Sequence, residues 1–238
     1  MITLSLKYNF KKNENKIHEV FSRNFYLSNI STKKRIGNHN KDVISVLVGN
    51  LLGDGFAEKR SNATRFQIHM SDKNAEYIFK LHSFFKEKGY CSLEKPKVKK
   101  QIGKNNKVYF SIKFKTFSFS SFNYLYDCFY FKQEINEKTI FKKIIPENIS
   151  SFLTEKAFAI WFMNDGGKSG KTYKLSTKSF SYHEVCLLQN AIFKNFNLHC
   201  NIQKHKNKFV FYFEKKYSNQ FSNLVKPNMY ECMYYKLH

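Results

Sequence analysis

The sequence predicts an α+β fold of two pseudo-symmetric halves, each with its elements in the order αββαββα and a four-stranded antiparallel sheet. Three observations lead to this prediction: two apolar segments of helix length end at Asp-Gly, alternating strands follow both, and an amphipathic helix comes next in both copies. We expect an N-terminal extension at 1–41 with one short helix at Lys16–Leu27, a first half at 42–146 and a second half at 147–238.

The two Asp-Gly segments read LVGNLLGDG at Leu47–Gly55 and FAIWFMNDG at Phe158–Gly166. Because the C-terminal end of a helix carries partial negative charge, an Asp there is unfavourable unless a positive charge compensates it. Asp54 and Asp165 therefore suggest a pair of carboxylates that something positive compensates. A divalent metal ion, which prefers oxygen ligands, is the obvious candidate. Two unrelated helix ends are the alternative interpretation.

The first half contains a strand, a helix, two further strands and a last helix after its Asp-Gly. The side chains of the strands alternate in polarity, as in half-buried strands, and the helices carry one apolar stripe. We place these elements at Thr64–Met70, Lys73–Lys88, Tyr90–Lys100, Lys107–Thr116 and Phe119–Phe131.

The second half repeats this order. Ser181 and Glu184 have the spacing of a capping box at the start of its amphipathic helix. We place the corresponding elements at Thr172–Lys178, Tyr182–Asn195, His199–His205, Lys208–Phe213 and Tyr217–Val225.

The net charge of +23 points to a polyanionic partner, because 41 Lys and Arg stand against 18 Asp and Glu over the whole length. Nucleic acid is the leading partner, with an anionic membrane surface as the alternative. No apolar run reaches the roughly 18 residues of a membrane helix, so we expect no membrane partner. The five cysteines have no metal-ligand spacing, and their odd number favours reduced thiols inside the cell. Abundant Lys, Asn, Phe, Ile and Tyr suggest an AT-rich organellar genome.

One face of each predicted sheet carries basic and amide side chains. A β-ribbon fits the major groove of DNA, where such side chains bond to base edges and lysines neutralise phosphates. A merely solvated face is the alternative. The residues that we expect to contact double-stranded DNA are Arg65, His69, Lys107, Tyr109, Lys113, Lys115, Ser176, Lys178, His199, Asn201, Gln203 and His205.

The two motifs, their order and the strand pattern resemble the LAGLIDADG homing endonucleases of the single-chain type, in particular the intron-encoded enzymes of mitochondrial large ribosomal RNA genes. The likeness runs from about Lys41 to the C-terminus, and WFMNDGGK makes the second copy more specific. The resemblance implies that the two motif helices pack together at the centre through small residues such as Gly49 and Gly53. Val48 and Ile160 depart from this pattern and leave the spacing of the helices open.

The resemblance further implies a site-specific endonuclease that makes a metal-dependent double-strand break for intron homing. Two or three divalent ions, Mg²⁺ in the first place, would be held by Asp54 and Asp165, with the carbonyl groups of Gly53 and Asn164 completing the coordination. Such ions supply an activated water and stabilise the charge on the phosphate.

The family also implies a basic residue near each scissile phosphate. Alignment of FKKIIP with MYYKLH selects Lys143 and Lys236, with Lys142 as a competitor and ordinary surface lysines as the alternative. Gln67 and Lys174, on the first polar strand of each half, are expected to orient water near the two sites.

An RNA maturase that assists splicing of its host group I intron is the second interpretation, with intron RNA as partner, and a DNA-binding protein without nuclease activity is the third. Both acids are intact, which favours the nuclease. We expect a monomer, located in the mitochondrion, with the plastid as the alternative.

Overall fold

The computed structural model describes residues 39–103, 106–177, 180–206 and 208–238. Nearly all of the predicted N-terminal extension at 1–41, including its helix at Lys16–Leu27, lies outside the described residues. Lys178, one of the predicted DNA contacts, also lies outside them.

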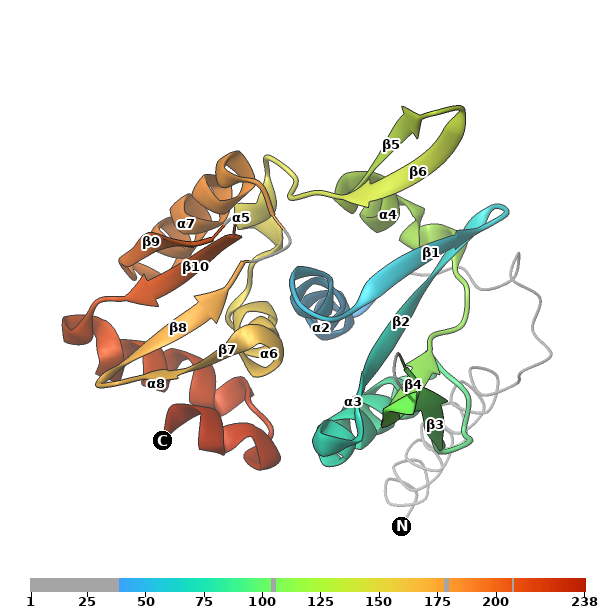
Figure 1. Cartoon of the computed structure of the whole chain (residues 1–238), viewed down its shortest axis with the longest axis horizontal. Helices are drawn as coiled ribbons and strands as arrows, with labels where there is room; N and C mark the ends of the chain where they lie inside the picture. Colours follow the sequence, from blue (N-terminus) through green and yellow to red (C-terminus); the bar gives the residue numbers. More distant parts are fainter. Residues whose placement is uncertain (1–38, 104–105, 178–179, 207) are drawn as a thin grey trace, which may run out of the picture.

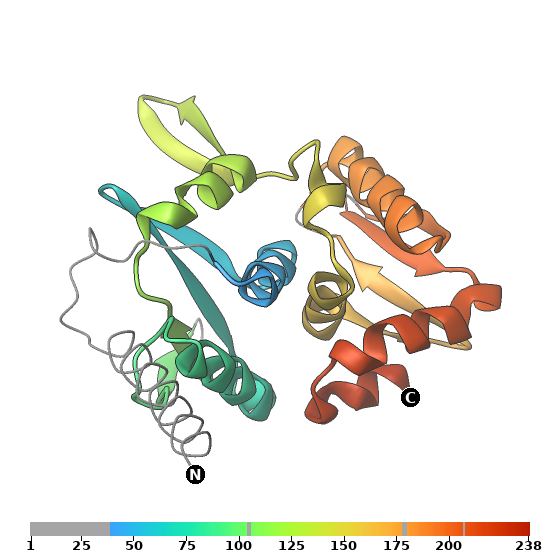
Figure 2. The same ribbon diagram turned by 180° about the vertical axis from the view of Figure 1, so that it is seen from behind.

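The first half forms a four-stranded antiparallel sheet in the order β1-β2-β4-β3 (Figure 1). Helices α3 and α4 lie on the rear of this sheet, as the view from behind shows (Figure 2). The elements of this half are α2 (Lys41–Leu52), β1 (Phe56–Arg60), β2 (Ala63–Ser71), η2 (Asp72–Asn74), α3 (Ala75–Glu87), β3 (Val98–Ile102), β4 (Val108–Lys115), η4 (Ser120–Phe122) and α4 (Asn123–Phe129).

The second half repeats the arrangement, with a sheet in the order β7-β8-β10-β9. Its elements are α5 (Ile149–Phe152), α6 (Glu155–Asp165), β7 (Gly166–Ser169), β8 (Thr172–Ser176), α7 (Tyr182–Phe196), β9 (Cys200–His205), β10 (Lys208–Phe213), η5 (Lys215–Tyr217), α8 (Ser218–Val225), η6 (Lys226–Asn228) and η7 (Glu231–Leu237). The predicted fold of two related halves with antiparallel sheets is confirmed.

Helices α2 and α6 pack against each other between the two sheets (Figure 1). Their contact is close because α2 presents Gly49 and Gly53 to its neighbour: a Cβ on Gly49 would lie 2.6 Å from the Cβ of Ile160. The bulky side chain of Ile160 thus fits into the space that Gly49 leaves free. Although Ile160 departs from the small-residue pattern, the two helices can therefore still pack closely. Near the start of both helices, Thr154 Oγ1 donates a hydrogen bond to Ser45 Oγ at 2.8 Å.

The capping box predicted at the start of α7 is confirmed. The side chain of Ser181 accepts a hydrogen bond from the main chain of Glu184, whose Oε2 accepts one from Ser181 N at 2.7 Å. The other oxygen of this buried carboxylate, Oε1, accepts a hydrogen bond from Ile145 N at 3.1 Å. The cap therefore also attaches the segment between the halves to α7.

Three predictions about the first half are wrong. In place of the strand expected at Tyr90–Lys100, the structure has the shorter strand β3, which begins only at Val98. The strand does not start earlier because Pro96 lacks the N–H that a strand would use. The helix expected at Phe119–Phe131 ends at Phe129, and a two-stranded hairpin of β5 (Tyr130–Ile135) and β6 (Lys138–Lys143) follows it. The alternation within these strands is visible in the sequence, but their Asn-Glu turn lacks the glycine of a typical hairpin signal.

The third error concerns the inner face of β4. The alternation of the expected strand at Lys107–Thr116 puts Val108 and Phe110 on the same apolar face as Ile112 and Phe114, which helices were expected to cover, but Val108 and Phe110 are 43% and 45% exposed. The reason is that α3 covers only the other end of the strand, where Phe85 and His82 contact the ring of Phe114.

Within the described residues, no helix is long and apolar enough to cross a membrane. All five cysteines are free thiols, as predicted.

Candidate active site

The two acids lie at the C-terminal ends of the paired helices. Asp54 is exposed in the turn that follows α2, and Asp165 is the partly buried last residue of α6. The residue before each acid faces the other helix, since a Cβ on Gly53 would lie 2.6 Å from the Cβ of Asn164. The ends of the two helices therefore meet, which brings both acids to the same region of the molecule.

A lysine is bonded to the carbonyl groups at each helix end. Lys143 Nζ donates hydrogen bonds to the main-chain oxygens of Leu51 and Gly55 at 2.9 and 2.7 Å, with that of Gly53 at 3.4 Å. Lys236 Nζ donates to the main-chain oxygen of Asn164 at 3.0 Å. These ammonium groups supply the positive charge that a helix C-terminus favours.

The charges of the two lysines and the two acids interact with one another. Burial lowers the pKa of Lys143 to about 8, although the charges of Asp165 and Asp54 act in the opposite direction. The pKa of Lys236 is lowered by burial in the same way and is raised by the same two carboxylates. Each lysine thus interacts with both acids, one of which belongs to the other half.

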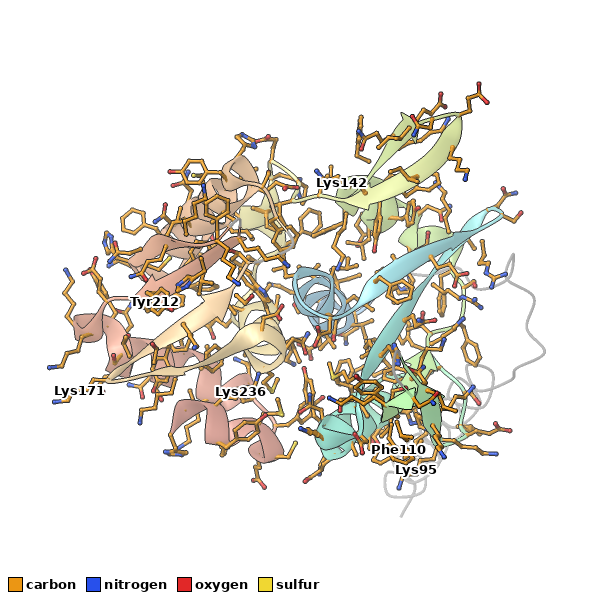
Figure 3. The ribbon with its side chains drawn as sticks, viewed as in Figure 1. Lys95, Phe110, Lys142, Lys171, Tyr212 and Lys236 are labelled. Atoms are coloured by element: carbon orange, nitrogen blue, oxygen red, sulfur yellow. The ribbon has the colours of Figure 1, made fainter. Side chains whose placement is uncertain are left out.

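The structure distinguishes Lys143 from its predicted competitor. Lys142 is paired with Phe131 on β5 and is exposed, because successive side chains of a strand point to opposite faces. Lys142 and Lys236 lie on opposite sides of the α2–α6 pair (Figure 3). The alignment of the two chain segments thus selected the two lysines that reach the helix ends.

The donor atoms at this site fit a hard divalent cation. Two carboxylates and the carbonyl groups of Gly53 and Asn164 are all oxygen ligands. The side-chain oxygen of Asn164 is buried without a hydrogen-bond partner, while its Nδ2 lies 3.4 Å from Asn50 Oδ1. The part of the chain that the structure describes holds no group of three His, Cys, Asp or Glu that could bind a metal.

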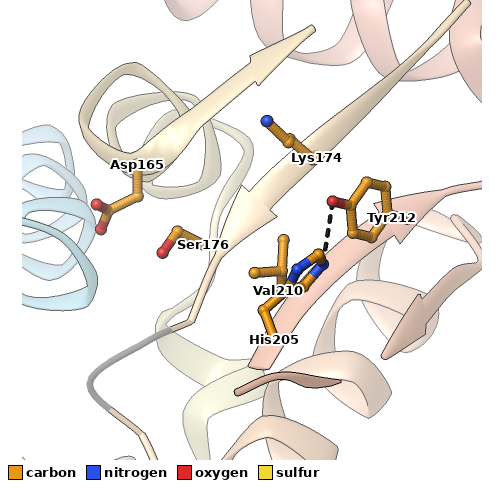
Figure 4. Close-up of a pocket in the computed structure, with 6 residues that line it drawn as sticks. All are labelled: Asp165, Lys174, Ser176, His205, Val210 and Tyr212. Carbon is orange, nitrogen blue, oxygen red and sulfur yellow. Dashed lines mark hydrogen bonds between the residues drawn. The ribbon is translucent and has the colours of Figure 1, made fainter. Parts of the chain in front are cut away.

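The surface beside Asp165 is hollowed by a cavity of about 270 Å³. Lys174 and Ser176 of β8 line it together with His205 and Tyr212 (Figure 4). His205 Nε2 and the Tyr212 hydroxyl are hydrogen-bonded at 3.2 Å. This pocket brings three predicted residues next to one acid. Tyr212 was missed, because the apolar run of β10 hides its position on the polar face.

Gln67 and Lys174 occupy corresponding places in the two halves. Gln67 on β2 pairs with Phe56 on β1, and Lys174 on β8 pairs with Gly167 on β7. Both partners lie two residues after the acid of their half. Gln67 is buried, whereas Lys174 is exposed. The two halves thus offer different groups at this position.

An acid that was not predicted lies among the predicted DNA contacts of the first sheet. Glu58 on β1 binds Arg65 at 2.7 Å and Arg60 at 2.8 Å, and Lys115 Nζ lies 3.8 Å away. Burial alone would raise the pKa of Glu58, but the hydrogen bond and charge of Arg65, together with Arg60 and Lys115, lower it. Arg65 and Lys115 are therefore held on the sheet surface before any ligand binds.

The other predicted contacts are distributed over the same two surfaces. His69 pairs with Lys113 across β2 and β4, and Asn201 and Gln203 lie on β9. Tyr109 is exposed on β4, with the ammonium of Lys107 over its ring at 5.6 Å. His199 is different: it precedes β9, and its ring packs against Phe193 of α7 and Tyr217.

Known proteins share this architecture. A sequence model of the LAGLIDADG DNA endonuclease family matches residues 44–221. The cytochrome b mRNA maturase bI2 of Saccharomyces cerevisiae is 34% identical over 230 residues, covering 92% of this chain and 54% of the relative. The chain thus spans about half the length of that relative.

Two further comparisons cover nearly the whole of the matched protein. The intron-encoded endonuclease ai4 of Dictyostelium discoideum is 34% identical over 163 residues, covering 66% of this chain and 98% of the relative. The solved structure of the homing endonuclease I-WcaI bound to its DNA recognition sequence superposes with a TM-score of 0.75 at 29% identity, covering 91% of this chain and 97% of that one. By the family match and by its fold, this chain belongs to the LAGLIDADG DNA endonuclease family.

Proposed function

We propose that this chain is a site-specific homing endonuclease that makes a double-strand break in a long DNA target. The observation that carries the proposal is the duplicated helix end: Asp54 and Asp165 are both intact, and each helix end has its own lysine. A protein that only bound nucleic acid would not need two carboxylates there, because they repel phosphates.

The residues of the site divide the chemistry between them. Asp54 and Asp165, with the carbonyl groups of Gly53 and Asn164, would hold two or three divalent ions, Mg²⁺ in the first place. Bound ions of this kind activate water and stabilise charge on the phosphate. Lys143 and Lys236 add positive charge where the phosphate becomes more negative.

The two halves would each serve one DNA strand. Their basic sheet surfaces supply phosphate and base contacts, including Arg65, Lys113 and Asn201. Gln67 and Lys174 would orient water on the two sides. Since both sheets and both acids belong to one chain, a monomer suffices for a double-strand cut. The name of the Saccharomyces cerevisiae relative, a cytochrome b mRNA maturase, supports a location in the mitochondrion.

Maturase activity is the second candidate function, because the Saccharomyces cerevisiae relative at 34% identity is named a maturase. The same basic surfaces would serve an intron RNA. A maturase would assist splicing whether or not Asp54 and Asp165 are intact, so the acids separate the two activities.

The experiment uses a plasmid that carries the joined exons flanking the insertion site of the host intron. We expect linear product with Mg²⁺ and none with EDTA. Asp54→Asn and Asp165→Asn should each abolish cleavage while duplex binding persists, and Asp127→Asn, which loses only an exposed ion pair to Lys59, should cleave normally. An uncut plasmid at all metal concentrations would contradict the proposal.

A further inference from the structure

The β5–β6 hairpin has no counterpart among the described residues of the second half. In the first half the site lysine, Lys143, is the last residue of β6, whereas Lys236 lies in the short helix η7. The hairpin projects beyond the sheet beside β1, at the edge of the molecule (Figure 1). One of the two site lysines is therefore attached to a projecting ribbon and the other is not.

The base of the ribbon is firmly held. Tyr130, which pairs with Lys143, accepts a hydrogen bond from Ala57 N at 2.9 Å through its hydroxyl. Its ring stacks on Tyr126 of α4 with centroids 4.6 Å apart, and Phe141 packs edge-on against the same ring. The tip turns tightly through Asn136 and Glu137, both at positive φ. The base of the ribbon is thus hydrogen-bonded to β1 and packed against α4, next to Lys143.

The two faces of the ribbon differ. Residues directly opposite each other in an antiparallel pair point to the same side. One face carries Tyr130 and Phe141 against α4, with an ion pair between Lys132 and Glu134. The other face, which we call the open face, has no acidic residue and consists of Phe131, Gln133, Ile135, Lys138, Ile140 and Lys142.

The open face combines exposed apolar side chains with two cations. Phe131, Ile135 and Ile140 are 58%, 44% and 43% exposed, which is unusual for three neighbouring large apolar groups unless they bind a partner. Lys138 and Lys142 lie at the two ends of this face. Lysines that reach phosphates position a protein on duplex DNA, and apolar side chains can contact base edges in a groove.

We propose that the β5–β6 ribbon is a DNA-binding arm that contacts the target duplex beside the cut site, on one side only. This inference rests on the proposed function, because it extends the DNA surface from the base of the arm at Lys143. Charge favours DNA over an apolar protein partner, since the open face bears only positive charges. Because the ribbon ends at Lys143, DNA bound to the ribbon beside the cut site would also influence the position of this lysine.

The first test measures the salt dependence of binding to a 40-base-pair duplex by fluorescence anisotropy. Lys138→Ala/Lys142→Ala should reduce the slope of log K against log salt by about 1.8, since each lost phosphate contact removes about 0.9. Raising the salt from 50 to 200 mM should therefore cost the variant about tenfold less affinity than it costs the wild type. The matched control Lys80→Ala/Lys194→Ala removes the same charge from exposed positions on α3 and α7, behind the sheets, and should retain the slope. An unchanged slope in the arm variant overturns the proposal.

The second test maps the contact directly. With Ile140 replaced by p-benzoylphenylalanine, irradiation should crosslink the protein to the joined-exon duplex on one side of the cut. Crosslinks only to the host intron RNA, or only within the protein chain, overturn the proposal.

The two tests separate the arm from the proposed function. Normal plasmid cleavage with an unchanged slope and no DNA crosslink rejects the arm and leaves the nuclease standing. A reduced slope and a DNA crosslink without any cleavage support the arm and reject the nuclease.

Discussion

Gly49 of α2 lies against the main chain of Ala157 on α6, with no space for a side chain between them. A Cβ at this position would stand 2.5 Å from the Ala157 carbonyl oxygen. Because main-chain atoms of a buried helix cannot move aside easily, this contact limits how closely the two helices can approach.

Gly49→Ala should therefore destabilise the protein by roughly 1–3 kcal/mol, as overpacking of a tight interior does. Gly167→Ala is the matched control, because a Cβ there meets nothing within 4 Å. Urea unfolding of both variants measures the difference. Equal stability of the two would mean that the helices shift apart without cost.

Lys143→Met should reduce single-turnover cleavage by about 100- to 1000-fold, the usual loss for one group that stabilises developing charge. Lys142→Met, one residue away on the opposite face, should lose less than threefold, because it does not reach the helix ends and saturating enzyme offsets the loss of its contact with DNA. Cleavage of both variants at saturating enzyme makes the comparison. An equal loss in both would assign the effect to net charge alone.

Glu58→Gln should strengthen binding to duplex DNA of unrelated sequence. The change removes one negative charge and releases Arg65 and Lys115 from their ion pair. A rise of about three- to tenfold in affinity at low salt, vanishing at high salt, is expected from screening. Weaker binding would show instead that Glu58 orients Arg65 for contact.

His39 should make the fold sensitive to mild acid. Its ring stacks on Phe122 and bonds to Tyr90 and Ser121, and burial lowers its pKa to about 4 from the usual 6.5. Between these two values the unfolded chain binds a proton that the folded chain does not, so stability falls as pH decreases. Stability of the wild type and His39→Gln, measured from pH 7 to 4.5, should show a shallower decline in the variant. Parallel curves would exclude His39 as the source.

Local rules made much of the fold predictable. The alternation of Thr64–Met70 matches β2, and the spacing of Ser181 and Glu184 gives the capping box, because both patterns depend on neighbours in the chain. The hairpin after Phe129 was not predicted, because its strands are short and their order of polar and apolar residues is compatible with a helix as well as with a hairpin. The exposure of Phe110 also escaped, because it depends on where α3 ends over the sheet.

The sequence by itself determined that two apolar helices end at Asp-Gly and that a basic alternating sheet follows each, since periodicity and charge are properties of the chain. The alignment of the two segments preferred Lys143 to Lys142, but only the tertiary structure shows that Lys143 reaches the helix end and that Ile160 fills the space at Gly49. It also decided that Glu58 holds Arg65. These relations join residues on different elements, and a distance between elements depends on packing, which no local pattern encodes.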